Sequence, residues 1–292
     1  MQLRGFLNLN KPAGPSSSAV VQAARNRLGR DLRVGHCGTL DPAATGVLVL
    51  AIGSATRLVE YVMPGDKEYR ATIRLGTETD SYDLAGAVLA ERPVPALTAA
   101  QLEAGLAEFR GPIMQAPPPV SALKRGGEPL YAKVRRGETV VTDPRPAEFY
   151  VLEQLAFDGR DLQVRAVCAG GTYIRSLAHD LGALWGCGGT LAALTRTRVG
   201  SFLIADAVDL TGLADSALAA AIIPPEQVLT ELPCAELSTA QALQVLHGAP
   251  VTLAAAASGT VRLFVNGRLL ALAVATGKLA QPKKVLLTAA EL

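Results

Sequence analysis

The chain is poor in aromatic residues, in cysteine and histidine, and in charge of one sign. Only 4% of its 292 residues are aromatic, and 28 basic side chains nearly balance 26 acidic ones. Its 4 cysteines, Cys37, Cys168, Cys187 and Cys234, form no CxxC pair, and its 3 histidines are scattered. A zinc site needs clustered ligands, and a secreted disulfide scaffold needs many cysteines in a short chain. Both classes of site are therefore disfavoured.

Long hydrophobic runs are also missing. Apolar runs such as residues 46–53 and 217–223 are far shorter than the roughly 18–20 residues that span a bilayer. The chain does not open with the charged start, apolar core and cleavage site of a signal peptide, so we expect a cytoplasmic protein. With 49% hydrophobic residues it can build packed cores, and its length suggests about two domains.

Basic residues gather in two segments, although the net charge is only +2. Residues 1–36 contain six basic side chains and one acid, and residues 121–146 contain six basic side chains and three acids. A local basic excess is typical of nucleic-acid binding. Taken alone, however, it is explained as well by solvated faces that are offset elsewhere.

Hydrophobic periodicity predicts an alternation of strands and helices. Strands are expected at 5–10, 47–52, 69–75 and 162–168, and helices at 19–28, 98–109, 172–184 and 209–229. Residues 117–146 interrupt this regularity with prolines, glycines and basic residues, and so long an insertion favours a functional arm. From about residue 232, a helix near 238–246 and short strands at 249–253, 259–265 and 268–275 suggest a small β-barrel.

Two motifs have the composition of a reactive site. In GHCGTLDPAATG, which starts at Gly35, glycines and a proline present Asp41 from a stiff loop before a buried strand. Asp before Pro also commonly just starts a turn. In GGTYIRS, which starts at Gly170, Tyr173 and Arg175 would share a face if extended. An Arg175–Asp41 pair would orient the carboxylate and keep it ionised, but a purely structural ion pair is equally compatible with the sequence.

Five motifs in order resemble those of the bacterial TruB-type tRNA pseudouridine-55 synthases. They are GFLNLNKP from Gly5, GHCGTLDPAATG from Gly35, DKEYRA from Asp66, SALK from Ser121 and GGTYIRS from Gly170. The resemblance implies an α/β fold of the α+β type, the pseudouridine synthase fold, with a mixed, mainly antiparallel curved sheet and a small C-terminal PUA-like β-barrel. We expect a catalytic domain at 1–230, with its thumb-loop insertion at about 117–146, and an RNA-binding domain at 231–292.

The same resemblance implies an activity and residue roles. Uridine 55 in the T loop of tRNA would be flipped out and isomerised without guide RNA, metal or organic cofactor. Asp41 matches the catalytic aspartate, which attacks the base or the sugar, and a carboxylate suits a reversible covalent stage. Tyr69 matches the aromatic residue that stacks on the base and is the expected proton acceptor of the last step. The remaining matches are Arg175, which pairs with the aspartate, Tyr173 and Leu194, which line the pocket, and His36, which enters the RNA.

Base flipping gives the basic segments a purpose, because phosphate contacts supply affinity and register. The candidate RNA contacts are Lys11, Lys124, Lys133, Arg135 and Arg136. The expected partner is tRNA, held by its T arm, with the acceptor end as a further candidate contact. We expect no membrane, no obligatory protein partner and a monomeric chain. A tRNA-folding chaperone role could accompany catalysis. Two departures from the family pattern are Cys37, where threonine is common, and Val120, where an aromatic residue is usual.

Three alternatives compete with this interpretation. The guide-RNA-dependent relatives of archaea and eukaryotes share the aspartate motif and the PUA domain but generally lack the thumb, so the insertion at 117–146 favours the stand-alone enzyme. A non-catalytic RNA chaperone would use the same pocket and basic arm, and loss of Asp41 would separate the two functions. If the chain were a structural module without an RNA partner, the match of five motifs in the family's order would be a coincidence.

Overall fold

The computed structural model describes residues 3–121, 124–125, 128–129, 136, 138, 140 and 142–292. Its helices are α1 (Ser17–Leu28), α2 (Val59–Val62), α3 (Ala99–Ala107), α5 (Ile174–Leu184), α6 (Asp215–Ala220) and α7 (Thr239–Leu246). Its longer strands are β1 (Gly5–Lys11), β3 (Thr45–Ile52), β4 (Lys67–Leu75), β7 (Gly111–Gln115), β10 (Arg145–Phe157), β11 (Asp161–Cys168), β12 (Gly189–Val199), β15 (Val251–Val265) and β16 (Arg268–Val285). The shorter ones are β2 (Val34–His36), β5 (Thr77–Thr79), β6 (Val88–Glu91), β8 (Lys124–Arg125), β9 (Glu128–Pro129), β13 (Phe202–Leu203) and β14 (Cys234–Glu236).

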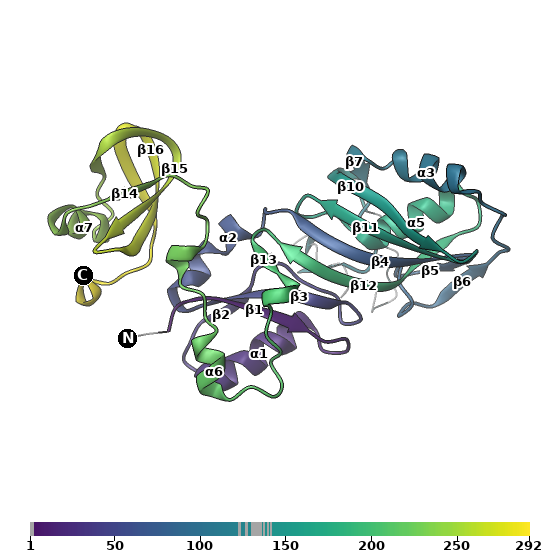
Figure 1. Cartoon of the computed structure of the whole chain (residues 1–292), viewed down its shortest axis with the longest axis horizontal. Helices are drawn as coiled ribbons and strands as arrows, with labels where there is room; N and C mark the ends of the chain where they lie inside the picture. Colours follow the sequence, from purple (N-terminus) through teal and green to yellow (C-terminus); the bar gives the residue numbers. More distant parts are fainter. Residues whose placement is uncertain are drawn as a thin grey trace.

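Nine of the described strands form one large mixed sheet (Figure 1). Its main path is β1-β3-β12-β4-β11-β10-β7, with β2 paired to β3 and β13 paired to β12. The β3–β12 pair is parallel and the other pairs of this sheet are antiparallel. The predicted mixed, mainly antiparallel sheet is therefore confirmed.

Strand β3 is buried on both faces, which explains its uninterrupted apolar sequence. Leu48, Leu50 and Ile52 join the core under α1 and α5. Val47 and Val49 point the other way, into a second core. Successive side chains of a strand point to opposite faces of the sheet. Because a core covers each face of β3, apolar side chains are needed on both faces.

The helix starts follow the expected capping chemistry. Ser16 caps α1, and its side chain accepts a hydrogen bond from the amide of Ala19 at 3.2 Å. Thr98 and Gln101 form a reciprocal capping box at the start of α3. Such side chains satisfy the free amides of a first helical turn. Both predicted helices are present, within two residues of their expected ends.

The helix expected at 209–229 is wrong for most of its length. Only Asp215–Ala220 is α-helical, followed by one 3₁₀ turn at Pro225–Gln227. The flanking chain runs along the edge strand β1 instead: Phe6 and Ile223 exchange backbone hydrogen bonds of 2.8 and 2.7 Å. This pairing covers an otherwise open sheet edge, and it overrides the helical preference of the alanine-rich sequence.

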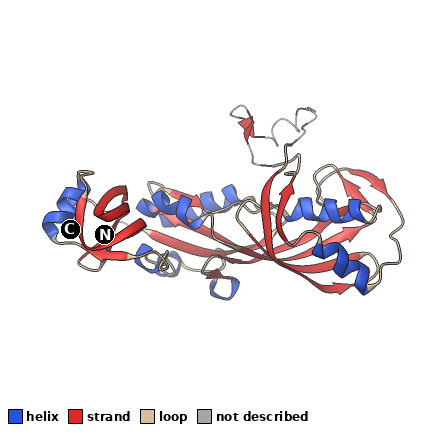
Figure 2. Ribbon diagram, turned by 90° about the horizontal axis from the view of Figure 1, so that it is seen from above, coloured by secondary structure: helices blue, strands red, loops and turns tan. Residues whose placement is uncertain are grey.

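The C-terminal residues build a second, smaller unit at one end of the large sheet (Figure 2). Strands β14, β15 and β16 form a three-stranded sheet, against which α7 packs around its own core. The hydrogen-bonded order is an open path of three strands, so the barrel stays a prediction. Leu269, Leu272 and Leu286 belong to the same apolar cluster as Phe6 and Val49, which ties this unit to the first.

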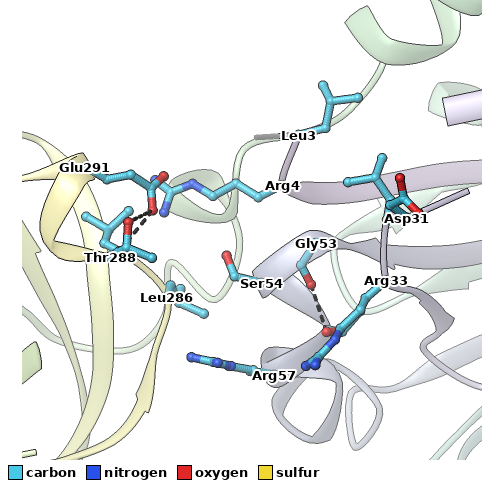
Figure 3. A pocket seen from close by; sticks show the side chains of 13 residues that line it. Leu3, Arg4, Asp31, Arg33, Gly53, Ser54, Arg57, Leu286, Thr288 and Glu291 are labelled. Atoms are coloured by element: carbon cyan, nitrogen blue, oxygen red, sulfur yellow. Dashed lines mark hydrogen bonds between the residues drawn. The ribbon is translucent and has the colours of Figure 1, made fainter. Parts of the chain in front are cut away.

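A cavity of about 240 Å³ lies at this junction (Figure 3). Arg4, Arg33 and Arg57 contribute to its wall from one unit, and Leu286 and Glu291 from the other. Two of its charges are compensated within the protein, because Arg4 pairs with Glu226 at 2.8 Å and Glu291 pairs with Arg268 at 3.2 Å. The junction therefore combines apolar contact with ion pairs.

Candidate active site

Asp41 lies in the loop between β2 and β3, and this loop is fixed to the neighbouring α1. The hydroxyl of Ser17 donates to the carbonyl of Leu40 and accepts from its amide, both at 2.8 Å. The backbone of Asp41 adds a turn, because its carbonyl accepts from the amide of Ala44 at 3.1 Å. A carboxylate presented by such a fixed backbone keeps one orientation.

Lys11 also holds this loop, and this overturns its predicted RNA contact. Its side chain is fully buried, and its ammonium donates to the carbonyls of Pro12, Pro42 and Ala44 at 2.8, 3.0 and 2.7 Å. The three donors of the ammonium are thereby used, and none remains for a phosphate. Lys11 therefore supports the Asp41 loop from inside.

Arg175, in the first turn of α5, meets Asp41 at the mouth of this loop. Its Nη2 donates to Oδ1 at 3.2 Å, and its Nε lies 3.0 Å from Oδ2. The Nε–H does not point at that oxygen, so the second contact is ionic without hydrogen-bond geometry. The guanidinium is buried, whereas the Asp41 side chain remains 39% exposed. The pair inferred from the sequence is present, with only the carboxylate accessible.

The other side of the Arg175 guanidinium is held by backbone and by a second carboxylate. Nη1 donates to the carbonyls of Ser81 and Val120 at 3.1 and 2.9 Å, and lies 3.7 Å from Oδ2 of Asp83. Because Val120 contributes only its carbonyl, this contact does not depend on the aromatic residue usual at that position. Arg175 is thus fixed from both sides, and sequence reasoning did not find Asp83.

Burial raises the pKa of Asp41 above its usual value, and the nearby charge of Asp83 adds to the rise. The Arg175 guanidinium opposes both effects and lowers the pKa. The carboxylate is therefore less acidic than an exposed aspartate, and its basicity and nucleophilicity are correspondingly greater.

Asp41 opens into a cavity of about 250 Å³ that brings most of the predicted site residues together. Tyr69, Tyr173, Arg175 and Leu194 line it with Asp41. Tyr69 is 8% exposed, and burial raises its pKa, which keeps the phenol neutral. This volume is near the lower end of the roughly 300–1,000 Å³ of small-ligand pockets.

Tyr173 is oriented through its backbone rather than through its ring. Gln115, at the end of β7, is buried; its amide donates to the carbonyl of Tyr173 at 3.0 Å and accepts from its amide nitrogen at 2.8 Å. In the first turn of α5, the hydroxyl of Ser176 donates to the carbonyl of Ala116 at 2.6 Å. These bonds join the start of α5 to the β7 end of the sheet, so Tyr173 and Arg175 keep a fixed position at the pocket.

His36 does not line this cavity. It lies on β2 and is half-buried, and its buried Nδ1 atom has no hydrogen-bond partner by geometry among the described residues. Burial and the charge of Arg196 lower its pKa, so its imidazole is neutral near pH 7. Its neighbour Cys37 is fully buried, and burial raises the pKa of that thiol to about 12. The departure at Cys37 thus concerns an unreactive core side chain.

The candidate contacts of the basic arm are described only in part. Lys133 and Arg135 lie outside the described residues, as does the side chain of Lys124, whose backbone forms β8. Arg136 is exposed and pairs with Glu138 at 2.7 Å. The role of these residues in RNA binding stays a prediction.

Two buried cations of the pocket wall were missed from the sequence. Arg196 is 1% exposed and donates to the carbonyls of Val47, Thr39 and Gly38 at 2.8, 3.2 and 3.0 Å. Lys67 is 6% exposed and donates to the carbonyls of Met63 and Gly65. Lys67 lies inside the DKEYRA motif, and Arg196 ends the segment LAALTR that starts at Leu191 and contains Leu194. Nothing in a single sequence says that a cation on a strand faces inward.

Within the described residues, no three His, Cys, Asp or Glu side chains lie close enough to hold a metal ion. The same part of the chain contains no helix that is both long and apolar enough to cross a membrane.

Comparison with known sequences decides the family. Residues 25–174 match the N-terminal domain of the TruB family pseudouridylate synthases, and residues 175–232 match the C-terminal domain of tRNA pseudouridylate synthase B. The chain belongs to the TruB family of pseudouridylate synthases. It is therefore an enzyme, an isomerase of the pseudouridine synthase class.

Relatives over nearly the whole length support this assignment. The tRNA pseudouridine synthase B of Aromatoleum aromaticum is 43% identical, covering 98% of this chain and 94% of the relative. That of an Azoarcus species is 41% identical, covering 97% and 95%.

Among solved structures, a Cbf5-Nop10-Gar1 complex matches with a TM-score of 0.74 and 28% identity, covering 98% of this chain and 85% of the other. An H/ACA RNP bound to a substrate RNA containing 2'-deoxyuridine matches with a TM-score of 0.73 and 26% identity, covering 97% and 85%. The predicted pseudouridine synthase fold of this TruB-family chain is thereby confirmed.

Proposed function

We propose that this TruB-family enzyme converts uridine 55 in the T loop of tRNA to pseudouridine, without guide RNA. Its family supports tRNA pseudouridylation. The observation that carries the proposal is the accessible Asp41 carboxylate, paired with buried Arg175 at the mouth of a 250 Å³ cavity lined by Tyr69. A paired carboxylate beside a partly apolar cavity suits covalent chemistry on a flipped nucleotide.

In the proposed reaction the target uridine leaves the RNA stack and its base enters the cavity. Tyr69 stacks on the base, Leu194 packs beside it, and Tyr173 closes the wall. Asp41 attacks the base or the sugar, and the C1'–N1 bond breaks. The base turns so that C5 bonds to C1', and the bond from Asp41 to the substrate breaks to release the carboxylate. In the last step the Tyr69 hydroxyl gives up its proton to solvent and, as the phenolate, accepts the C5 proton. N1 takes up a proton from solvent, which restores the aromatic pyrimidine system. Arg175 orients Asp41 throughout through its planar fork.

The basic arm is proposed to grip the RNA while the nucleotide is out. Lys124, Lys133, Arg135 and Arg136 are the proposed phosphate contacts, and they would supply affinity and register rather than sequence choice. The neutral ring of His36 is proposed to stack within the opened T loop. We further propose that the PUA-like unit from residue 231 touches the acceptor end, that the enzyme works as a cytoplasmic monomer, and that a tRNA-folding chaperone role accompanies catalysis.

The site of modification is tested with two tRNA transcripts. One carries the natural T loop, and the other has uridine 55 replaced by cytidine. Pseudouridine is mapped by carbodiimide labelling and primer extension after incubation with the purified enzyme and no guide RNA. We expect one labelled position, 55, in the first transcript and none in the second. Modification elsewhere in both transcripts would overturn the proposed site, and a requirement for added guide RNA would overturn the stand-alone enzyme.

A further inference from the structure

The wall of the cavity beside Asp41 carries more basic than acidic side chains. Arg196 and Lys67 both line it, and both are buried, at 1% and 6% exposure. Among the described residues neither side chain makes an ion pair; both donate to backbone carbonyls, and Arg196 also has the Tyr69 hydroxyl as a hydrogen-bond partner. The remaining cation, Arg175, is matched by Asp41 and Asp83. The wall therefore carries two buried positive charges without a contacting carboxylate.

Buried cations without a counter-ion are costly, because desolvation is not offset by a partner charge. Carbonyl dipoles reduce that cost but leave the net charge in place. Such an arrangement is explained when a negative charge arrives in the same low-dielectric space during the reaction, where preorganised cations stabilise it strongly. The position of the two cations shows which part of the substrate they would face.

Both cations lie beside the residue that is proposed to hold the base. Arg196 on β12 is the direct cross-strand neighbour of Tyr69 on β4, and Lys67 precedes Tyr69 by two residues on the same strand. Residues two apart on a strand share a face. The cations are thus grouped around the base-binding wall, whereas Asp41 is held by Arg175 across the loop.

We propose that Arg196 and Lys67 are catalytic residues that stabilise the negative charge on the detached uracil ring. When the C1'–N1 bond breaks, its electron pair stays with the base, whichever atom Asp41 has attacked. The uracil ring is then anionic, with charge shared by N1 and its carbonyl oxygens. The new C5–C1' bond consumes this charge, and the bond from Asp41 to the substrate breaks. The base of the last step then takes the C5 proton and N1 gains a proton, so the net change moves one proton from C5 to N1 and needs no oxidant or reductant.

This inference rests on the proposed function, because it requires a uracil ring in the cavity. It also differs from a merely structural role for Arg196, which clamps the carbonyls of Gly38 and Thr39 close to Asp41. A clamp would matter equally for every substrate. A charge-stabilising pair matters less when the leaving base carries negative charge more easily.

The test compares two tRNAs that differ only at the target position, which holds uridine in one and 5-fluorouridine in the other. Fluorine withdraws electrons and makes the detached ring a better anion. Single-turnover loss of the N-glycosidic nucleoside is followed by nuclease digestion and chromatography at saturating enzyme. The variants are Arg196→Gln and Lys67→Gln. Arg74→Gln serves as the matched control, since Arg74 lies on β4 outside the cavity and pairs with Asp161 at 2.8 Å.

We expect each pocket variant to slow the uridine substrate about 100-fold, with binding unchanged. On the 5-fluorouridine substrate the deficit should shrink on the order of tenfold, and the control should match wild type on both. An equal deficit on both substrates in both variants would overturn the proposal and assign the residues to structure. If Arg196→Gln fails to fold by thermal unfolding, Lys67→Gln alone decides. A wild-type enzyme that converts neither substrate would instead refute the proposed function.

Discussion

Asp41 and Arg175 stand 134 residues apart in the chain, yet their side chains meet at 3.0 and 3.2 Å. The sheet brings the two residues together. Asp41 lies in the loop between β2 and β3, and Arg175 lies in the first turn of α5, the helix that follows β11. Backbone carbonyls of Ser81 and Val120 aim the guanidinium at the carboxylate. A reactive group on a loop is thereby held as rigidly as one on a strand.

Replacing Arg175 by lysine tests this geometry. Lysine keeps the positive charge but cannot reach Asp41, Ser81 and Val120 at once, because it lacks the planar fork. We expect kcat to fall about 100-fold or more, with KM for tRNA nearly unchanged, since the buried group is not placed to grip RNA. Steady-state kinetics on one tRNA transcript measure both values. A variant with wild-type kcat would show that charge alone is sufficient.

The pH dependence of the reaction rate reports the protonation state of the Asp41 carboxylate. The carboxylate acts as the anion, so the rate should be lost as pH falls through its pKa, which burial raises above the usual value of about 3.9. The nearby charge of Asp83 contributes to this rise. Substitution Asp83→Asn should therefore move the inflection of the single-turnover pH profile to lower pH. An inflection that moves upward would contradict the assigned influence of Asp83.

The same raised pKa makes a prediction about stability. A carboxyl group whose pKa is higher in the folded than in the unfolded state favours folding while protonated, and this contribution is lost as pH rises through the folded-state pKa. At pH 7 the Asp41→Asn variant should therefore unfold at the same or a modestly higher temperature than wild type. The difference should vanish below about pH 4. A clearly lower Tm at pH 7 would mean that the ionised pair stabilises the fold.

Much of the fold could be predicted from sequence, because local patterns dominate it. The alternation at Tyr69–Leu75 and the cap at Ser16 each specify their element over a few residues. Strand β12 was missed, since its Gly189 start and mixed polar residues give no clear period. The segment at 209–229 was misassigned because its conformation depends on pairing with β1, a contact that no local pattern encodes.

The candidate site also contains residues that the sequence predicted and residues that it did not. Two motifs pointed to Asp41, Tyr173 and Arg175, and the family resemblance added Tyr69 and Leu194. The structure brings all five around one cavity. The sequence did not predict three further charged residues of the site, Asp83, Arg196 and Lys67. The direction of a charged side chain on a strand or loop depends on the sheet around it. Lys11 was misjudged for the same reason: a lysine beside Pro12 reads as exposed, whereas its ammonium is enclosed by three carbonyls.

Substitution Lys11→Met tests the corrected role of that residue. It removes the ammonium donor from the carbonyls of Pro12 and Ala44, whereas the Pro42 carbonyl keeps the amide of Gly14. Each buried group left unsatisfied costs about 1–3 kcal/mol. We expect a lower free energy of unfolding in urea. The salt dependence of tRNA binding should keep its slope, because no phosphate contact is lost. A shallower slope with unchanged stability would return Lys11 to the RNA interface.

Tritium release from tRNA labelled at uracil C5 tests the central claim most directly. Wild-type enzyme is compared with Asp41→Asn at protein concentrations that give equal RNA binding, without added cofactor or guide RNA. The account predicts release by the wild type and none by the variant, because only the carboxylate can form and break the covalent bond. Release by Asp41→Asn at the wild-type rate would contradict the assignment of Asp41, and tight binding without release by the wild type would leave only RNA folding assistance.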